Sequence, residues 1–264
     1  MTRRLGQFEA AALAYVQMRG VRTVKTGDLV AALRITAKQE RELLSRMARA
    51  GMIAGVRKGL YLFPEKLPLG GVWTPDDATA INTLMADKQA RYQISGPSAF
   101  NRYGYDEQVP SRIVLYDDAL YGERQIGRVS LTLIKVSEDR LGSIEQVQTP
   151  TGETLVYSSR VRTLIDAVYD WSRFDGLPRA YDWIRRDIGA GRITSDNLAD
   201  TAIRYGNMGT VRRIGALFEQ MDVDEHVLRR LQRTLTPSTA KIPFVPNRPT
   251  RGTFLKRWRV VING

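Results

Sequence analysis

The sequence predicts an α+β protein: an N-terminal winged helix-turn-helix over residues 1–66, then a larger mixed domain over residues 67–264. Helical apolar spacing alternates with short β-type runs, and residues 64–77 hold three prolines and a Gly-Gly pair. Net charge also changes along the chain, from 12 − 4 = +8 over residues 1–63 to 19 − 24 = −5 over residues 64–225 and 9 − 0 = +9 over residues 226–264. Two basic ends around an acidic middle indicate two surfaces for a polyanion, and a basic proteome or simple solubility is the alternative.

Two helices are expected in the first 35 residues. Apolar side chains at helical spacing predict a helix over about residues 6–19 that ends at Gly20. A short strand at Val24 follows, and Thr26 is expected to cap a helix with one apolar face. That face consists of Leu29, Val30 and Leu33.

A third helix and a hairpin complete the N-terminal part. Thr36 and Gln39 have the spacing of a capping box, so the helix begins after Thr36, and Gly51 is placed to end it. Its buried face is expected to hold Leu43, Leu44 and Met47. The run "MIAGVRKGLYLF" predicts two short strands that meet at the basic tip 57–59.

This order of elements is that of a winged helix-turn-helix, whose last helix enters the major groove of double-stranded DNA. Gln39 and Arg41 are side chains that hydrogen-bond adenine and guanine edges, and the lysines and other arginines suit phosphates. The candidate DNA-binding residues are Lys25, Thr36, Lys38, Gln39, Arg41, Ser45, Arg46, Arg49, Arg57 and Lys58. A winged helix used only for protein contacts is the alternative.

The second domain should combine a mostly antiparallel sheet with a helical block. Asp76 or Asp77 can cap a helix that runs to about Gln89, and "SGPSAF" opens a helical turn over 97–102. Strands are expected at 91–95, 111–117, 127–136 and 153–158. Five helical segments follow from residue 160, and one or two late strands lie at 241–246 and 254–263.

Three blocks in this domain resemble a known family. They are "ISGPSAFNRYGYDEQVP" (94–110), "SSRVRTLIDAVYD" (158–170) and "RIGALFEQM" (213–221), and "GLYLFP" and "WRVVING" agree with them. Together they resemble the AbiEi antitoxins of type IV abortive-infection toxin–antitoxin systems.

The resemblance implies that the winged helix binds inverted repeats in its own promoter and represses it. It also implies that the second domain counteracts a nucleotidyltransferase-like toxin, with or without a direct complex. It supplies no catalytic residue. The alternative is a DNA-targeted enzyme, a nuclease or a reverser of the toxin's modification, with catalysis in the second domain.

Residues for catalysis or metal binding are scarce. There is no cysteine, which fits a reducing cytoplasm, and no apolar run approaches the roughly 20 residues that span a membrane. His226 is the one histidine, and the adjacent pair Asp117 and Asp118 is more typical of a turn than of a cation site. We therefore expect no catalytic residue, no metal and no cofactor.

Several arginines remain open to two interpretations. Arg160 and Arg162 begin an apolar helix, where one could pair with Asp166 or contact RNA, and Arg212 and Arg213 raise the same question. Basic residues alternate with Phe254 and Trp258 near the end of the chain, a pattern that suits nucleic acid, although Trp258 could be core. This second basic surface would consist of Arg248, Arg251, Lys256, Arg257 and Arg259.

Overall fold

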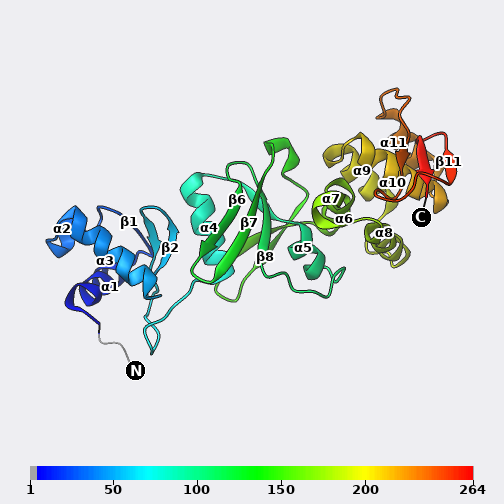
Figure 1. The fold of residues 1–264 in the computed structure, drawn as a ribbon. Coiled ribbons are helices and arrows are strands. Elements are labelled where there is room, and N and C mark those ends of the chain that lie inside the picture. The colour runs from blue at the N-terminus through cyan, green and yellow to red at the C-terminus, as the bar shows by residue number, and fades with distance from the viewer. Residues whose placement is uncertain (1–4, 264) are drawn as a thin grey trace.

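Three parts follow one another along an elongated molecule (Figure 1). The structure, a computed structural model, describes residues 5–263. A small helical unit with its own sheet lies at the N-terminal end, a six-stranded sheet lies in the middle, and a block of helices with the last strands lies at the other end (Figure 1). The chain is therefore α+β, as the sequence predicts.

The N-terminal unit, residues 5–63, contains three helices and three short strands. They are α1 (Gln7–Arg19), β1 (Thr23–Lys25), α2 (Val30–Leu33), α3 (Ala37–Arg49), β2 (Ala54–Arg57) and β3 (Leu60–Leu62). The strands form an antiparallel sheet in the order β1-β3-β2. Gly20 takes a left-handed conformation after α1, and Thr36 caps α3, both as predicted. The predicted start of α2 at Thr26 is wrong, because residues 26–29 are turns and the helix begins at Val30.

The central part contains two helices around one six-stranded sheet. Its elements are α4 (Asp77–Lys88), β4 (Tyr92–Ile94), α5 (Gly96–Arg102), β5 (Ile113–Asp117), β6 (Gly122–Ile126), β7 (Val129–Lys135), the 3₁₀ turn η1 (Glu138–Arg140), β8 (Ile144–Gln148) and β9 (Thr154–Ser158). Asp76 caps α4 through the amide of Thr79, as one of the two predicted caps.

The strand order of this sheet is β6-β7-β5-β4-β9-β8. The prediction of a mostly antiparallel sheet needs correction, because β5 pairs with β7 and β4 with β9 in parallel. The parallel pairing of β5 and β7 arises because β6 lies at the edge and returns the chain to a place beside β5. Strands β6 and β8 are absent from the prediction; both are edge strands with mainly polar, exposed side chains.

The last part consists of the helical block and a small three-stranded sheet. Its elements are α6 (Arg160–Tyr169), α7 (Trp171–Phe174), α8 (Arg179–Gly189), α9 (Ser195–Tyr205), α10 (Met208–Gln220), α11 (Glu225–Arg233), β10 (Ile242–Pro243), β11 (Thr253–Leu255) and β12 (Val260–Ile262). The single strand predicted over 254–263 is wrong, because a turn at 256–259 splits it into antiparallel β11 and β12. Arg259 has a φ of 52°, a left-handed conformation that a continuous strand does not allow.

Buried apolar side chains form three clusters. One lies among α1, α2 and α3, and another fills the helical block around Trp258. The third joins Val56 and Leu60 of the N-terminal sheet to Ile81 of α4 and Leu131 of β7. The boundary near residue 66 stays a prediction, and this shared cluster crosses it.

No helix within residues 5–263 is long and apolar enough to cross a membrane.

Candidate nucleic-acid interface

Helix α3 has one buried face and one exposed basic face. Leu43, Leu44 and Met47 are almost fully buried, as the sequence predicts. The candidate residues on the other face are all exposed, namely Lys38, Gln39, Arg41, Ser45, Arg46 and Arg49. The structure therefore brings the candidates of this helix together on one accessible face.

The cap of α3 limits what Gln39 can contact. The Thr36 amide donates to Oε1 of Gln39 at 2.8 Å, and the Gln39 amide donates to Oγ1 of Thr36 at 3.2 Å. A bidentate contact with adenine needs both the oxygen and the nitrogen of the side-chain amide. Such a contact by Gln39 therefore competes with the cap, and the assignment of Gln39 to DNA stays a prediction.

Glu40 is a key residue of this unit that the sequence analysis overlooked. Its side chain is fully buried, and its two carboxylate oxygens accept hydrogen bonds from the amides of Gly27 at 2.6 Å and Leu29 at 2.8 Å. These bonds hold the turns before α2 against α3 and explain why α2 begins late. Glu40 lies three and four positions before Leu43 and Leu44, so the helical periodicity of α3 places it on the same buried face.

The two pairs of basic residues on α3 differ in their partners. Arg46 donates from Nε to the buried carboxylate of Glu9 at 3.2 Å, and Arg49 donates to the Ser45 carbonyl at 3.5 Å. No ion pair joins Lys38 or Arg41 to another of the residues 5–263. Lys38 and Arg41 are therefore the cations on α3 that are most available to a phosphate or a base.

The hairpin between β2 and β3 presents one paired and one unpaired cation. Arg57 donates to both oxygens of Asp87 in α4, at 2.6 and 2.5 Å, whereas Lys58 at the tip is exposed and has no ion pair with a described residue. The hydrogen bonds from Arg57 hold the pKa of Asp87 below its usual value, against the effect of desolvation. Lys25, on β1, also lies close enough to Asp87 to lower this pKa. The predicted phosphate contact by Arg57 therefore competes with a carboxylate inside the protein.

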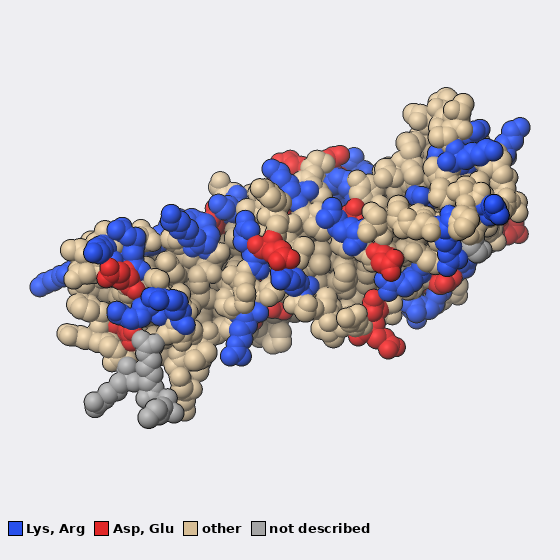
Figure 2. Space-filling view, in the orientation of Figure 1, with Lys and Arg blue, Asp and Glu red and all other residues tan. Residues whose placement is uncertain are grey.

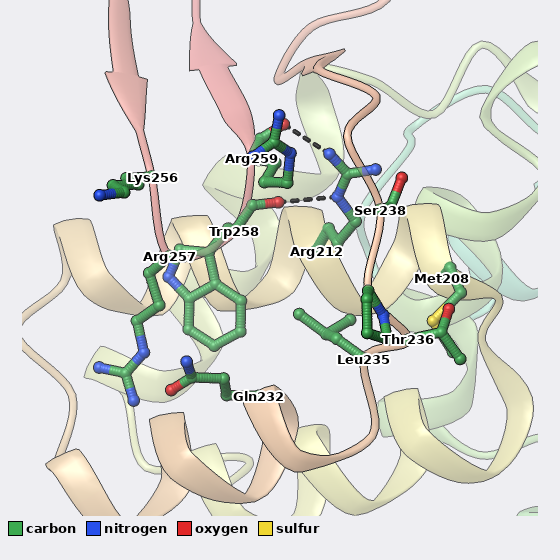
Figure 3. Close-up of a pocket in the computed structure, with 11 residues that line it drawn as sticks. Met208, Arg212, Gln232, Leu235, Thr236, Ser238, Lys256, Arg257, Trp258 and Arg259 are labelled. Atoms are coloured by element: carbon green, nitrogen blue, oxygen red, sulfur yellow. Dashed lines mark hydrogen bonds between the residues drawn. The ribbon is translucent and has the colours of Figure 1, made fainter.

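The five residues predicted to form a second basic surface are distributed over two cavities and one exposed position. Lys256, Arg257 and Arg259 line a cavity between α10, α11 and the β11–β12 turn (Figure 3). Arg248 lines a different cavity beside Tyr181, and Arg251 is exposed outside both. Figure 2 shows basic side chains at both ends of this face of the molecule, interspersed with acidic ones along its length. The turn at 256–259 brings Lys256, Arg257 and Arg259 to one cavity, apart from the cavity that Arg248 lines.

Trp258 belongs to the core. Its side chain is fully buried against Gly215, where a Cβ atom would overlap the indole, and its Nε1 donates to Glu219. The interpretation of Trp258 as a nucleic-acid contact is therefore wrong.

Arg162 is also a structural residue. It is fully buried on α6, donates to Asp166 at 2.8 Å as the sequence suggested, and donates to the carbonyls of Arg140 and Gly142. Arg160 is partly exposed and pairs with buried Asp187 at 3.1 Å. An RNA contact by Arg162 is excluded by its burial.

Arg212 and Arg213 are both about nine-tenths buried. Arg212 donates to the carbonyls of Trp258, Ala240 and Arg259 at 2.6–2.7 Å. Arg213 donates to the carbonyl of Pro243 at 3.3 Å. Both arginines therefore connect α10 to the last strands.

The residues considered for metal binding lie apart. His226 is exposed near the start of α11, with its Nε2 3.3 Å from Asp196, and Asp117 accepts from the amides of Ala119 and Leu120 in a turn. No group of three or more His, Cys, Asp or Glu side chains within residues 5–263 is placed to hold a metal ion.

Comparison with known proteins gives a family but no activity. Residues 18–149 match DUF6088, a family of unknown function, and the chain belongs to this family. No curated protein matches the chain. The fold is similar to the crystal structure of the RV2827C protein from Mycobacterium tuberculosis, with a TM-score of 0.58 and 16% identity over 98% of this chain and 92% of that one.

Proposed function

We propose that the chain is a DNA-binding transcriptional autorepressor and the antitoxin of a toxin–antitoxin pair of the abortive-infection type. Its N-terminal unit acts as a winged helix-turn-helix on double-stranded DNA. The remainder counteracts a nucleotidyltransferase-like toxin in the cytoplasm and has no catalytic activity of its own.

The exposed basic face of α3 is the observation that carries the DNA-binding part. An α-helix fits the major groove of B-DNA, which is about 12 Å wide. On α3, Lys38 and Arg41 are exposed and unpaired among the described residues, while the opposite face is fixed in the core. Arg41 suits a guanine edge, and Lys38 suits a phosphate.

The hairpin supports the same orientation. In a winged helix, the strands that follow the recognition helix contact the DNA backbone beside it. The β2–β3 hairpin directly follows α3, and its tip presents Lys58 to solvent. Such a unit reads a short site, so two copies on the inverted repeats of a promoter would raise affinity and specificity.

The antitoxin part rests on the three sequence blocks at 94–110, 158–170 and 213–221. In the structure, the first block covers α5 and the following loop, the second covers α6, and the third lies on α10. Helices α5 and α10 both contact α6, so the three blocks meet in one packed region of the molecule. This shared region is where we expect the residues that support antitoxicity.

Two measurements in cells test the proposal. The full protein should repress a reporter gene placed behind the chain's own promoter. The double variant Lys38→Ala with Arg41→Ala should not repress it. The same double variant should still rescue cells from the toxin encoded beside it, because neutralisation does not require α3. An unrepressed promoter would contradict the DNA-binding part, and a lack of rescue by a stable, well-expressed protein would contradict the antitoxin part.

A further inference from the structure

A cavity of about 440 Å³ opens between α10, α11 and the turn that joins β11 to β12. Figure 3 shows its basic side chains, with Arg212 from α10 and Lys256, Arg257 and Arg259 from the turn. Its volume lies in the range of small-molecule sites, roughly 300–1,000 Å³. The cavity is at the opposite end of the molecule from α3 (Figure 1), so a ligand here is independent of the proposed DNA contact.

Two guanidinium groups at this cavity have no carboxylate partner among the described residues. Arg212 donates only to the carbonyls of Trp258, Ala240 and Arg259. Arg259 donates to the carbonyl of Thr239, and its Nε is buried without a partner. Desolvation and the charges of Arg259 and Arg213 lower the pKa of Arg212. Because buried charges are normally paired, an anion at this cavity would relieve an uncompensated positive charge.

The acidic groups nearby do not supply that charge. Glu225 accepts from both terminal nitrogens of Arg257, at 2.8 and 3.0 Å, and also from Arg229. Glu219 accepts from Trp258. Neither carboxylate lines the cavity. Of the four cations that line the cavity, only Arg257 has an ion-pair partner. Arg212 and Arg259 lie beside each other, and the Lys256 side chain points away from them (Figure 3).

Arg259 occupies a conformation that favours glycine. Its φ is 52°, in the left-handed region, where any side chain other than that of glycine is strained. Such positions cluster at ligand-binding sites, where a particular side chain is needed despite the strain. The guanidinium of Arg259 lies 5.8 Å from the ring centre of Phe254, which helps to hold it beside Arg212.

Neutral residues complete the cavity. Thr236, Ser238 and Gln232 offer hydroxyl and amide groups, and Leu235 and Met208 offer an apolar surface. A phosphate monoester carries about −1.5 to −2 charge and three acceptor oxygens, which matches several cations better than a single carboxylate does. The apolar wall is suited to a nucleobase or a sugar face.

We propose that this cavity binds the phosphate of a nucleoside phosphate, either a free nucleotide or the phosphorylated end of a nucleic-acid strand. Arg212, fixed by its three carbonyl contacts, and Arg259 would hold the phosphate oxygens. Lys256 would add charge at the rim. This inference does not depend on promoter binding or on antitoxicity.

Isothermal titration of the full chain tests it with four probes: pyrophosphate, ATP, and a short single-stranded oligonucleotide with and without a 5′-phosphate. Pyrophosphate and at least one phosphorylated probe should bind. ATP binding without oligonucleotide binding identifies a free nucleotide, and dependence on the 5′-phosphate identifies a strand end. The double variant Arg259→Gly with Lys256→Gln should weaken binding of the probes by about tenfold or more. Glycine is chosen at position 259 because it adopts the left-handed conformation without strain.

The matched control is Arg248→Gln with Arg251→Gln, which removes the same charge from the same tail outside this cavity. It should bind the probes as the parent does. If the double variant at 256 and 259 does not fold, Lys256→Gln alone replaces it, because Lys256 is exposed. Equal losses in the test and control variants, or no binding of any probe up to about 1 mM, would overturn the proposal.

Discussion

Replacing Glu40 with glutamine tests how the N-terminal unit fixes α2 against α3. The parent carboxylate accepts two backbone hydrogen bonds, at 2.6 and 2.8 Å, inside the protein. Glutamine keeps one acceptor oxygen, and its amide group then faces the other backbone N–H as a second donor. Losing one charge-assisted bond and leaving a donor unsatisfied should cost about 2–4 kcal/mol locally.

Amide hydrogen exchange measures this cost where it arises. If the amides of Gly27 and Leu29 exchange by local opening, 2–4 kcal/mol corresponds to about 30-fold to 1,000-fold faster exchange. The control is Glu42→Gln, the same chemical change on an exposed position of the same helix. Both variants remove one negative charge near the proposed DNA surface, so they differ only in the two hydrogen bonds from Gly27 and Leu29. Equal exchange rates at 27–29 in the two variants would refute the role given to Glu40.

Four further predictions concern the hairpin, the buried arginine and the domain boundary. Asp87→Asn should free Arg57, tighten binding to non-specific DNA and steepen its salt dependence by about one unit; the gain should vanish when Arg57→Ala is added, and persistence of the gain would contradict the prediction. Because Arg57 lowers the pKa of Asp87, the stabilisation from this pair should be present above about pH 4 and lost below it. The free energy of unfolding of the parent and of Asp87→Asn, compared over a range of pH, measures this effect. Arg162→Met should lower the free energy of unfolding by about 3–5 kcal/mol in denaturant titrations, because buried Asp166 keeps only Arg140 as an ion-pair partner and the carbonyls of Arg140 and Gly142 lose their donor. An unchanged midpoint would contradict the structural role of Arg162. A fragment of residues 1–66 should melt at a lower temperature than residues 1–158, because the shorter one exposes the apolar face of the N-terminal sheet, and equal melting temperatures would contradict the shared core.

The sequence predicted most local structure because its determinants are local. The Thr36–Gln39 cap, the left-handed Gly20 and the apolar face of α3 each depend on residues within one or two turns of one another. The five helical segments predicted from residue 160 have strong 3.6-residue periodicity and correspond to α6, α8, α9, α10 and α11, whereas the short helix α7 was not predicted.

The predictions that were wrong concern elements whose position depends on contacts between residues far apart in the sequence. The start of α2 depends on Glu40, which is more than ten residues further along the chain. The parallel pairing of β4 with β9 joins segments about sixty residues apart, and no local pattern specifies it. The polar sequences of β6 and β8 conceal two edge strands that take their regularity from β7 and β9.

The candidate DNA-binding residues follow the same division. Exposure of the α3 candidates follows from helical periodicity and was predictable. Arg57 and Arg46 form ion pairs with Asp87 and Glu9, which lie on other helices. These ion pairs were therefore not predictable from the sequence of α3 or of the hairpin. The tail residues were grouped by closeness in sequence, but Arg248 lines a different cavity from Lys256, Arg257 and Arg259.

Binding of the purified chain to its own promoter, compared with a scrambled duplex of the same length over a range of salt concentrations, tests the central claim most directly. Parent protein and Arg41→Ala are measured beside Arg19→Ala, which removes an exposed cation from α1 instead. We predict that Arg41→Ala lowers the preference for the promoter by about 1–3 kcal/mol, while Arg19→Ala leaves it unchanged. An unchanged preference in Arg41→Ala would contradict the placement of α3 in the major groove.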